Sequence, residues 1–330
     1  MSNSTKQDFP SSPLLLGIDG GGTKTVAWLG CLRDGALIRI GEGKSGPSNP
    51  RAAGFEVAFQ NLRKATQLAF LDAQLPAAQL DVACLCLAGT GRQQERDAVL
   101  NWARQVGLSK KSVIISEAEA VLAAVEIDRD WSQSAQRAEV ALVCGTGSLA
   151  WGRISTQSSP IRTGGWGYLM GDEGSGFWLG QHVLQFACKI SDGREAERSL
   201  LDLVLTKLQL TAAENLVGWC YELPGSRERI ASLAPLAFMN SSVGKLKDIV
   251  NRGAHELALM IAAVAGRLGG LQYDLAMAGS VVAHQTEYRL LIARYLNDLK
   301  CAPASIQMVE QPVSGTLKLA LQHYGTKSHE

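Results

Sequence analysis

A β-strand, a glycine turn and a second β-strand occur twice in this chain, and the repeat restricts the possible folds more than any other feature. In the first copy, an apolar run over residues 14–18 ends in Asp19 and is followed by glycines at 20–22 and a second apolar run. The second copy, with its glycine turn at 145–148, begins roughly 125 residues further along the chain. Two lobes that each start with this unit can close on one phosphate chain from opposite sides.

The first glycine turn is predicted to hold phosphate. Glycines allow positive φ and a close approach of the backbone, and Thr23 and Lys24 add a hydroxyl, a cation and amides. A Walker loop is excluded because Thr23 stands where its lysine would be, and a dinucleotide loop because Thr25 replaces its last glycine. Both of those loops also open a helix, whereas residues 25–40 read as a hairpin with an Asp34-Gly35 turn.

Length and composition indicate a soluble globular protein large enough for two domains. The chain has 330 residues, of which 46% are hydrophobic and 19% charged, and its net charge is +1. That charge argues against a nucleic-acid partner, and no apolar run approaches the ~18 residues of a membrane span. Residues 1–12 are polar and lack the apolar core of a signal peptide, so we expect a disordered tail on a cytoplasmic protein.

The seven cysteines favour a reduced protein without a structural metal. Most of them lie in apolar runs, and they form neither a C-x-x-C pair nor a cluster with histidines. Cys84 and Cys86 are two residues apart on an expected strand and would face the same side. A metal or iron–sulfur cluster held within one chain is therefore not expected.

Strands and helices alternate in the first half, which predicts a partly parallel sheet covered on both faces. The second half is expected to be mainly helical. The expected strands beyond the first hairpin are 81–87, 112–115, 140–144, 149–154, 273–278 and 306–309, and the expected helices are 51–72, 93–106, a helix starting at 116, 175–190, 195–208, 212–221, 248–271, 288–299 and 315–324. The polar stretch 128–138 reads as a linker or exposed loop.

The order and spacing of four motifs resemble the N-acetylglucosamine kinase branch of the BadF/BadG/BcrA/BcrD ATPase family. These motifs are Asp19 to Lys24, Gly145 to Ser148, the pair Gly164-Gly165-Trp166-Gly167 and Gly171-Asp172-Glu173-Gly174-Ser175, and Ala278-Gly279-Ser280. That family belongs to the actin, hexokinase and Hsp70 ATPase superfamily. The resemblance implies two RNase H-like lobes, each a mixed sheet flanked by helices, with the nucleotide in the cleft between them. The expected lobes are 13–128, completed by the C-terminal helix 315–330, and 129–314.

The resemblance also implies an ATP site with magnesium. The two turns would hold the β- and γ-phosphates, with Thr23 and Thr146 donating hydroxyl hydrogen bonds and Gly279 and Ser280 lying against the adenosine. Asp19 would organise Mg²⁺ through water. The implied ATP-binding residues are Gly21, Gly22, Thr23, Lys24, Gly145, Thr146, Gly147, Gly279 and Ser280. Ordinary hairpin turns are the alternative interpretation of each turn alone.

The resemblance implies a sugar site around Trp166. A stretch with so many glycines is an unusual place for a core tryptophan. The side chain could instead pack on a sugar ring or an acetyl methyl. By resemblance the sugar-binding residues would be Asn49, Glu117, Ser148, Gly165, Trp166, Gly167 and Asp172. Asn49 can also be read as a loop asparagine before a proline. Asp172 and Glu173 can be read as a helix-start pair favoured by the helix dipole.

Glu117 is the expected catalytic base. Sugar phosphorylation needs a carboxylate that accepts the hydroxyl proton, and the family places an aspartate at this position, after the strand that here ends near Ser116. The longer glutamate could move the carboxylate by about 1 Å, enough to affect the rate. The alternative is structural: Ser116 and Glu119 fit a capping box, and Glu117 would then only favour the helix dipole.

The leading hypothesis is a Mg²⁺- and ATP-dependent kinase of the 6-hydroxyl of N-acetylglucosamine or a related amino sugar. One alternative is an ATPase that activates a partner enzyme, as other members of the broad family do with a cysteine-held iron–sulfur cluster at a dimer interface. The apolar setting of the cysteines speaks against it. Another is a sugar-binding protein whose catalysis is reduced because of Glu117. The expected partners are a sugar and ATP, without nucleic acid or membrane. Whether the chain forms a homodimer is left open.

Overall fold

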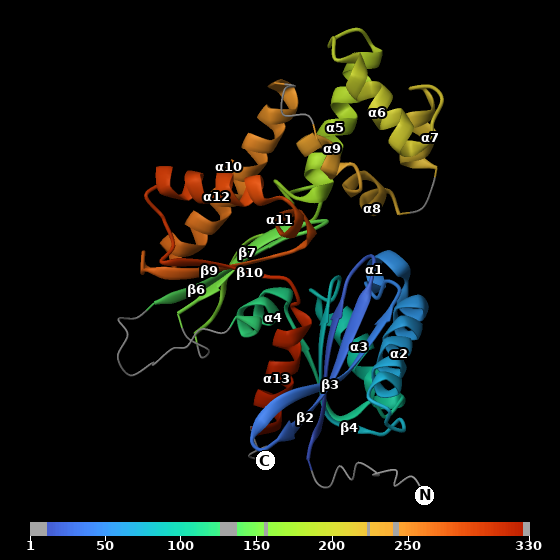
Figure 1. Cartoon of the computed structure of the whole chain (residues 1–330), viewed down its shortest axis with the longest axis vertical. Coiled ribbons are helices and arrows are strands. Elements are labelled where there is room, and N and C mark those ends of the chain that lie inside the picture. Colours follow the sequence, from blue (N-terminus) through green and yellow to red (C-terminus); the bar gives the residue numbers. More distant parts are fainter. Residues whose placement is uncertain (1–11, 126–136, 155–157, 223–224, 240–243, 326–330) are drawn as a thin grey trace, which may run out of the picture. The chain divides into compact units, whose positions relative to one another are not determined.

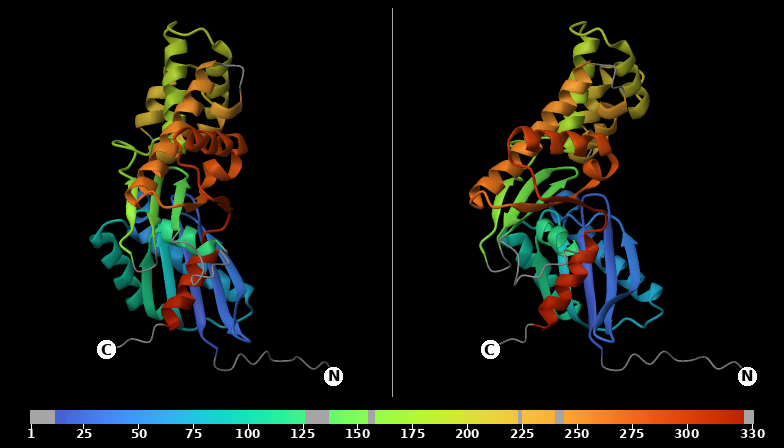
Figure 2. Two further views of the ribbon diagram at one scale, coloured as in Figure 1. Left: turned by 90° about the vertical axis from the view of Figure 1, so that its left-hand side faces the viewer. Right: turned by 60° about the vertical axis from the view of Figure 1, so that its left-hand side comes forward.

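The computed structural model describes residues 12–125, 137–154, 158–222, 225–239 and 244–325, and it divides the chain into two compact units (Figures 1 and 2). Unit 1 comprises residues 1–124 and 311–330, and unit 2 comprises residues 125–310. The expected N-terminal tail, apart from its last residue, and most of the expected linker 128–138 lie outside the described residues.

Unit 1 contains a five-stranded mixed sheet of order β3-β2-β1-β4-β5. Its strands are β1 (Leu14–Gly20), β2 (Thr25–Arg33), β3 (Ala36–Ser45), β4 (Leu80–Leu87) and β5 (Ser109–Ile115). β1, β2 and β3 form two antiparallel hairpins, while β4 and β5 run parallel to β1. The expected hairpin is confirmed, and its turn uses Asp34 and Gly35, both with positive φ.

Alternate residues of the central strands face two different helical layers in unit 1. Leu16 and Ile18 pack toward α2 (Phe55–Asp72) and α3 (Gln93–Gln105), whereas Leu15 packs toward α13 (Val313–Gly325). In Figure 1, α13 and α4 (Glu117–Ala124) lie on one side of this sheet and α2 and α3 on the other. Gly17 permits this packing, since a Cβ there would lie 2.5 Å from the backbone nitrogen of Leu317.

Unit 2 repeats the topology of unit 1. Its sheet order is β10-β9-β6-β7-β8, so in both units the first strand pairs antiparallel with the second and parallel with the fourth. The strands are β6 (Ala138–Cys144), β7 (Ser148–Arg153), β8 (Ile161–Gly164), β9 (Tyr273–Ala278) and β10 (Ser305–Val309). The internal repeat read from the sequence is therefore a repeat of a whole sheet.

Helices form the rest of unit 2, and the long α10 packs across β6, β7 and β8. They are α5 (Gly176–Ser191), α6 (Arg198–Leu208), α7 (Asn215–Tyr221), α8 (Ser226–Ala231), α9 (Ala234–Met239), α10 (Gly244–Arg267), α11 (Ser280–His284) and α12 (Thr286–Asp298). Their apolar faces join the inner strands in one core that contains Leu142, Leu257 and Met277. None of the helices in the described ranges is both long enough and apolar enough to cross a bilayer.

Two differences from the expected elements have local causes. The helix expected over 51–72 is interrupted at Gly54, whose φ of 82° ends α1 (Pro50–Ala53) before α2 begins. The sequence also gave no sign of β8, α8, α9 or α11, each six residues long or shorter. Such short elements carry too few periodic positions to be distinguished from loops.

Candidate active site

The first glycine turn connects β1 to β2, and its amides are only partly bonded within the protein. The Gly21 amide donates to Lys24 O (2.9 Å), and Gly21 O accepts from the amides of Ser48 and Asn49 (3.0 and 3.1 Å). Within the described chain, no acceptor is recorded for the amides of Gly22 and Thr23. The carbonyl is thus satisfied by protein while the amides are available to an anion.

Gly20 of this turn is required for space, and the expectation of positive φ is wrong for the three glycines at 20–22. Gly20, Gly21 and Gly22 are not among the described glycines with positive φ. A Cβ on Gly20 would instead lie 2.0 Å from Ser48 Oγ and 2.6 Å from Leu87 Cδ2. The turn therefore packs closely against the loop that carries Asn49.

Asn49 lies beside the first turn and is the N-cap of α1. Its Oδ1 accepts from the amides of Arg51 (3.0 Å) and Ala52 (3.3 Å) and so caps α1. Its side-chain Nδ2 has no hydrogen-bond partner among the described residues. The capping bonds fix the side chain, and Nδ2 is left as a donor for a ligand hydroxyl.

Asp19, the expected magnesium residue, lies at the carboxyl end of β1. Burial raises its pKa from 3.8 to about 6, and the nearby Lys24 counteracts the rise. Its carboxylate has no hydrogen bond or ion pair with the described residues. A half-buried carboxylate without a protein partner suits a hydrated Mg²⁺, which takes oxygen ligands and keeps several waters. The described residues contain no group of three or more metal-ligating side chains, so nucleotide and water would supply the other ligands.

The register of unit 1 brings Glu117 to the same sheet edge as Asp19. Asp19 is opposite Cys86 on β4, and Cys86 is opposite Ile115 on β5, two residues before Glu117. Two strand spacings separate β1 from β5, about 10 Å. Burial raises the pKa of the Cys86 thiol well above its ordinary value, and the Asp19, Glu117 and Glu119 carboxylates raise it further. Both expected carboxylates therefore lie near the carboxyl ends of the parallel strands, where such sheets bind ligands.

Glu119 is the capping residue of α4. Its Oε2 accepts from the Ser116 amide (2.7 Å) and hydroxyl (2.6 Å), and the Glu119 amide donates to Ser116 Oγ (3.2 Å). This confirms the capping box expected from the sequence. Glu117 is exposed at the first position of α4 and has no part in that box.

The second glycine turn, between β6 and β7 of unit 2, has a similar pattern of hydrogen bonds. Gly147 O accepts from the Gly145 amide (3.0 Å), and the carbonyls of Gly145 and Thr146 accept from the first amides of α5 (2.8 and 3.1 Å). No acceptor for the Thr146 and Gly147 amides is recorded in the described ranges. Each unit thus presents unbonded amides from the turn after its first strand.

Asp172 lies directly beside this second turn. It is a non-glycine residue with φ 60°, and its side chain is only 3% exposed. Oδ2 pairs with Arg227 Nη2 at 2.9 Å, and Oδ1 lies 3.4 Å from the Ser148 amide. The Ser148 hydroxyl donates to Glu173 O (2.7 Å), which fixes the 172–173 backbone against the turn. Asp172 is therefore a buried, ion-paired carboxylate with a more specific environment than a helix-start residue needs.

Arg227 is the residue that sequence reasoning missed. It lies 55 positions after Asp172, on the short α8, and the sequence around it contains no glycine motif. Its guanidinium also lies over the Tyr168 ring, with Cζ 5.8 Å from the centroid. No sequence signal would have singled it out.

Trp166 is 63% exposed, as its glycine-rich surroundings suggested. Arg162 covers one face of the indole, with Cζ 5.4 Å from the ring centroid, and the Gly165 amide donates to Ser148 O (2.9 Å). The positive φ values of Gly165 (68°) and Gly167 (89°) shape the loop on both sides of the indole. Unit 2 thus brings Ser148, Gly165 and Asp172 together.

Gly279, after β9, is required by close packing in unit 2. Its φ is 106°, and a Cβ would lie 2.4 Å from the Cys144 carbonyl, at the start of the second turn. Ser280, the other residue expected at adenosine, is the first residue of α11. The end of β9 therefore lies next to the second turn.

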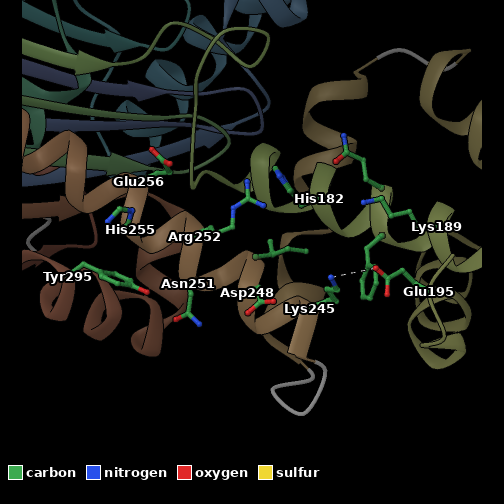
Figure 3. A pocket seen from close by; sticks show the side chains of 13 residues that line it. His182, Lys189, Glu195, Lys245, Asp248, Asn251, Arg252, His255, Glu256 and Tyr295 are labelled. Carbon is green, nitrogen blue, oxygen red and sulfur yellow. Dashed lines mark ion pairs between the residues drawn. The ribbon is translucent and has the colours of Figure 1, made fainter. Parts of the chain in front are cut away.

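A separate groove of about 660 Å³ in unit 2 contains none of the expected site residues (Figure 3). It is lined by side chains from α5, α10 and α12, among them His182, Arg252 and Tyr295. Burial lowers the pKa of His182, and the Arg252 and Lys189 charges lower it further, against a hydrogen bond to Trp178 O. Its acidic and basic side chains are mixed, and it is distinct from the glycine turns.

Two mixed sheets of the same strand order, flanked by helices and each with a glycine turn after its first strand, define the fold of the actin-like ATPases and sugar kinases. The sequence profile of the BadF/BadG/BcrA/BcrD ATPase family matches residues 16–301. The chain belongs to that family, which confirms the resemblance read from its motifs.

Curated relatives match about three quarters of the chain. A Clostridium acetobutylicum protein named N-acetylmuramic acid/N-acetylglucosamine kinase is 28% identical over 253 residues, which are 76% of this chain and 78% of the relative. A Dictyostelium discoideum protein named N-acetyl-D-glucosamine kinase is 29% identical over 243 residues, 71% and 73% of the two chains.

Solved structures share the fold. A Chromobacterium violaceum protein provisionally described as an N-acetylglucosamine kinase has a TM-score of 0.72 at 22% identity and covers 94% of this chain and 100% of its own. A ROK family glucokinase from Streptomyces griseus, solved with glucose and AMPPNP, has a TM-score of 0.56 at 16% identity, with 94% and 99% covered. The expected fold class is confirmed.

Proposed function

We propose that this protein is a kinase that transfers the γ-phosphate of ATP to the 6-hydroxyl of N-acetylglucosamine or a closely related amino sugar. The observation that carries the proposal is the pair of glycine turns, one in each unit, each with two neighbouring amides that have no recorded acceptor in the described chain: Gly22 and Thr23 in the first turn, and Thr146 and Gly147 in the second. The names of both curated relatives, which include N-acetylglucosamine kinase, support it.

In this proposal the turns bind the phosphates of ATP. The amides of Gly22, Thr23, Thr146 and Gly147 donate to phosphate oxygens, and the two threonine hydroxyls add further donors. Lys24 adds positive charge, and Gly279 with Ser280 lies against the adenosine. Asp19 would hold Mg²⁺ through water, and the ion would supply positive charge that neutralises the phosphates.

The side chains proposed to bind the sugar are Asn49 of unit 1 and Asp172 and Trp166 of unit 2. The Asn49 Nδ2 donates to a hydroxyl, the Asp172 carboxylate accepts from hydroxyls, and the free face of Trp166 packs on the ring or the acetyl group. Gly165, Gly167 and Ser148 shape this part of the site.

Glu117 accepts the proton of the 6-hydroxyl in this mechanism. The hydroxyl oxygen forms a bond to the γ-phosphorus as the bond from that phosphorus to the β–γ bridging oxygen breaks, so the products are the sugar 6-phosphate and ADP. Glu117 is suited to the role because it is exposed at the carboxyl edge of the sheet, while Glu119 is committed to the helix cap.

The test is ADP release from ATP and Mg²⁺ with a panel of sugars, followed by phosphorus NMR of the product. N-Acetylglucosamine or a related amino sugar is expected to stimulate ADP release and to carry the phosphate on its 6-oxygen. Glucose and galactose serve as controls for the acetamido group. If no sugar stimulates ADP release, the kinase assignment is wrong.

A sugar-binding protein with little turnover is the second candidate, and the glutamate at position 117 favours it. It predicts tight binding of the amino sugar by calorimetry without phosphate transfer. In that case E117D is expected to raise phosphate transfer, whereas for a competent kinase the same change brings no gain.

A further inference from the structure

Arg227 pairs with Asp172, one residue of the proposed sugar site in unit 2, and lies beside the second glycine turn. Its Nη2 lies 2.9 Å from Asp172 Oδ2, and a Cβ on Gly147 would lie 2.6 Å from the same nitrogen. The side chain is 30% exposed, compared with 3% for Asp172. The guanidinium and the buried carboxylate therefore both lie against the second glycine turn.

The short helix α8 that carries Arg227 is held closely against α5. A Cβ on Gly180 of α5 would lie 1.9 Å from Ile230 O, so only glycine allows the two backbones to approach this closely. On the other side, Tyr168 contacts the guanidinium and packs on Phe177 of α5, with ring centroids 4.9 Å apart. These contacts hold Arg227 in one place relative to Asp172.

The carboxylate of Asp172 depends on this arginine for its orientation. One oxygen is fixed by Arg227 and the other faces the Ser148 amide at 3.4 Å. A carboxylate offers about four acceptor positions, so about two remain for hydroxyl groups of a ligand. Without the guanidinium, the nearly fully buried Asp172 carboxylate would lose both its counter-ion and the hydrogen bond that fixes its orientation.

We propose that Arg227 is a positioning residue, which orients the Asp172 carboxylate so that it accepts hydrogen bonds from the amino sugar. This inference rests on the proposed function and adds a residue to its sugar site. The planar guanidinium sets the direction of the carboxylate as well as its charge, and a lysine ammonium sets only the charge.

The experiment compares R227K with R229K, a matched change on the same helix, where Arg229 lies over the Trp219 ring. For each protein, calorimetry gives the Kd for N-acetylglucosamine and kinetics gives KM for sugar and for ATP. R227K is expected to raise the sugar Kd and KM tenfold or more with ATP KM changed less than twofold, while R229K changes neither. R227K keeps the charge and is therefore suited to preserving the fold, which its thermal unfolding temperature checks.

The D172N variant separates positioning from a general loss of structure. Because Arg227 acts through Asp172, R227K in the D172N background is expected to weaken sugar binding no further. Additive effects, an unchanged sugar KM in R227K, or a rise in ATP KM alone would overturn the inference. If the parent protein neither binds nor phosphorylates any amino sugar, the proposed function fails, and this inference fails with it.

Discussion

Ser116 donates two hydrogen bonds to one carboxylate oxygen of Glu119, from its amide at 2.7 Å and from its hydroxyl at 2.6 Å. The S-x-x-E pattern therefore forms a reciprocal helix cap in which Glu119 is the acidic partner. The neighbouring Glu117 does not take part in the cap, although both carboxylates lie near Cys86. The two glutamates can therefore be tested against each other.

E117Q is expected to lower kcat by about 100-fold or more, because the amide cannot accept the hydroxyl proton. Sugar binding by calorimetry should change much less. E119Q serves as the control: it weakens the cap by about 1 kcal/mol in the free energy of unfolding and leaves kcat near that of the parent protein. Equal kcat values in the two variants would remove Glu117 from the mechanism.

D19N is expected to stabilise the fold at neutral pH in magnesium-free buffer while abolishing magnesium-dependent activity. The pKa of Asp19 is raised to about 6 in the fold, so the folded state binds this proton more tightly than the unfolded state does. The free energy of unfolding of the parent protein therefore falls by about 3 kcal/mol as pH rises from about 4 through 6. Chemical denaturation across pH 4 to 7.5 should show a stabilising effect of D19N that shrinks toward pH 4.

D34N, in the exposed β2–β3 turn, is the matched control for D19N and should show no such pH-dependent gain. A D19N variant that is less stable than the parent protein at pH 7.5 would contradict the burial argument.

W166A is expected to raise the sugar KM roughly tenfold, equivalent to about 1.4 kcal/mol, through the loss of aromatic packing on the ring. Because Trp166 is 63% exposed, the free energy of unfolding should change by no more than about 1 kcal/mol, mainly through the lost Arg162 contact. Y221A, which removes an aromatic ring that is 86% exposed, is the control and should leave sugar KM unchanged.

G147A is expected to impair sugar binding more than G145A does. A Cβ on Gly147 would meet Arg227 Nη2 at 2.6 Å and Asp172 Oδ2 at 2.8 Å, so the ion pair must shift. At Gly145 the nearest atom is 3.8 Å away, an ordinary contact. Kd values for sugar from calorimetry give the comparison, and a larger effect of G145A would argue against a tightly packed Asp172–Arg227 pair.

Thiol labelling tests the alternative of a partner-activating ATPase with an iron–sulfur cluster. Cys31, Cys84, Cys86 and Cys144 are buried, and burial raises the pKa of Cys84 to about 12. We expect these four to react with a disulfide reagent only after unfolding, while the exposed Cys188 reacts in the native protein and its signal disappears in C188S. Iron bound in the purified protein would instead favour the alternative.

Sequence patterns over a few neighbouring residues were sufficient to predict single strands and turns of the fold. The Asp34-Gly35 turn between alternating strands predicts its hairpin, and the continuous apolar run over β4 predicts a strand buried on both faces. Gly54 was a visible break inside an otherwise helical pattern, yet a single glycine is also tolerated within helices, so the pattern alone did not end α1.

The missing parts of the candidate site depend on contacts between residues far apart in the sequence. The capping role of Glu119 follows from a spacing of three residues, whereas the Asp172–Arg227 pair joins residues 55 positions apart. The helix that brings Arg227 into place is six residues long and depends on Gly180 of another helix. Propensity and periodicity describe neighbours in sequence and contain no information about such a contact.

The packing of α13 on β1 also has a consequence for biosynthesis. Leu317 and Ala320 complete the buried cluster around Leu15 and Cys84, although they are synthesised roughly 300 residues after β1. Unit 2 is continuous in sequence and can fold before α13 is synthesised. Unit 1 then has one face of its sheet uncovered until α13 is synthesised, which happens only after the whole of unit 2.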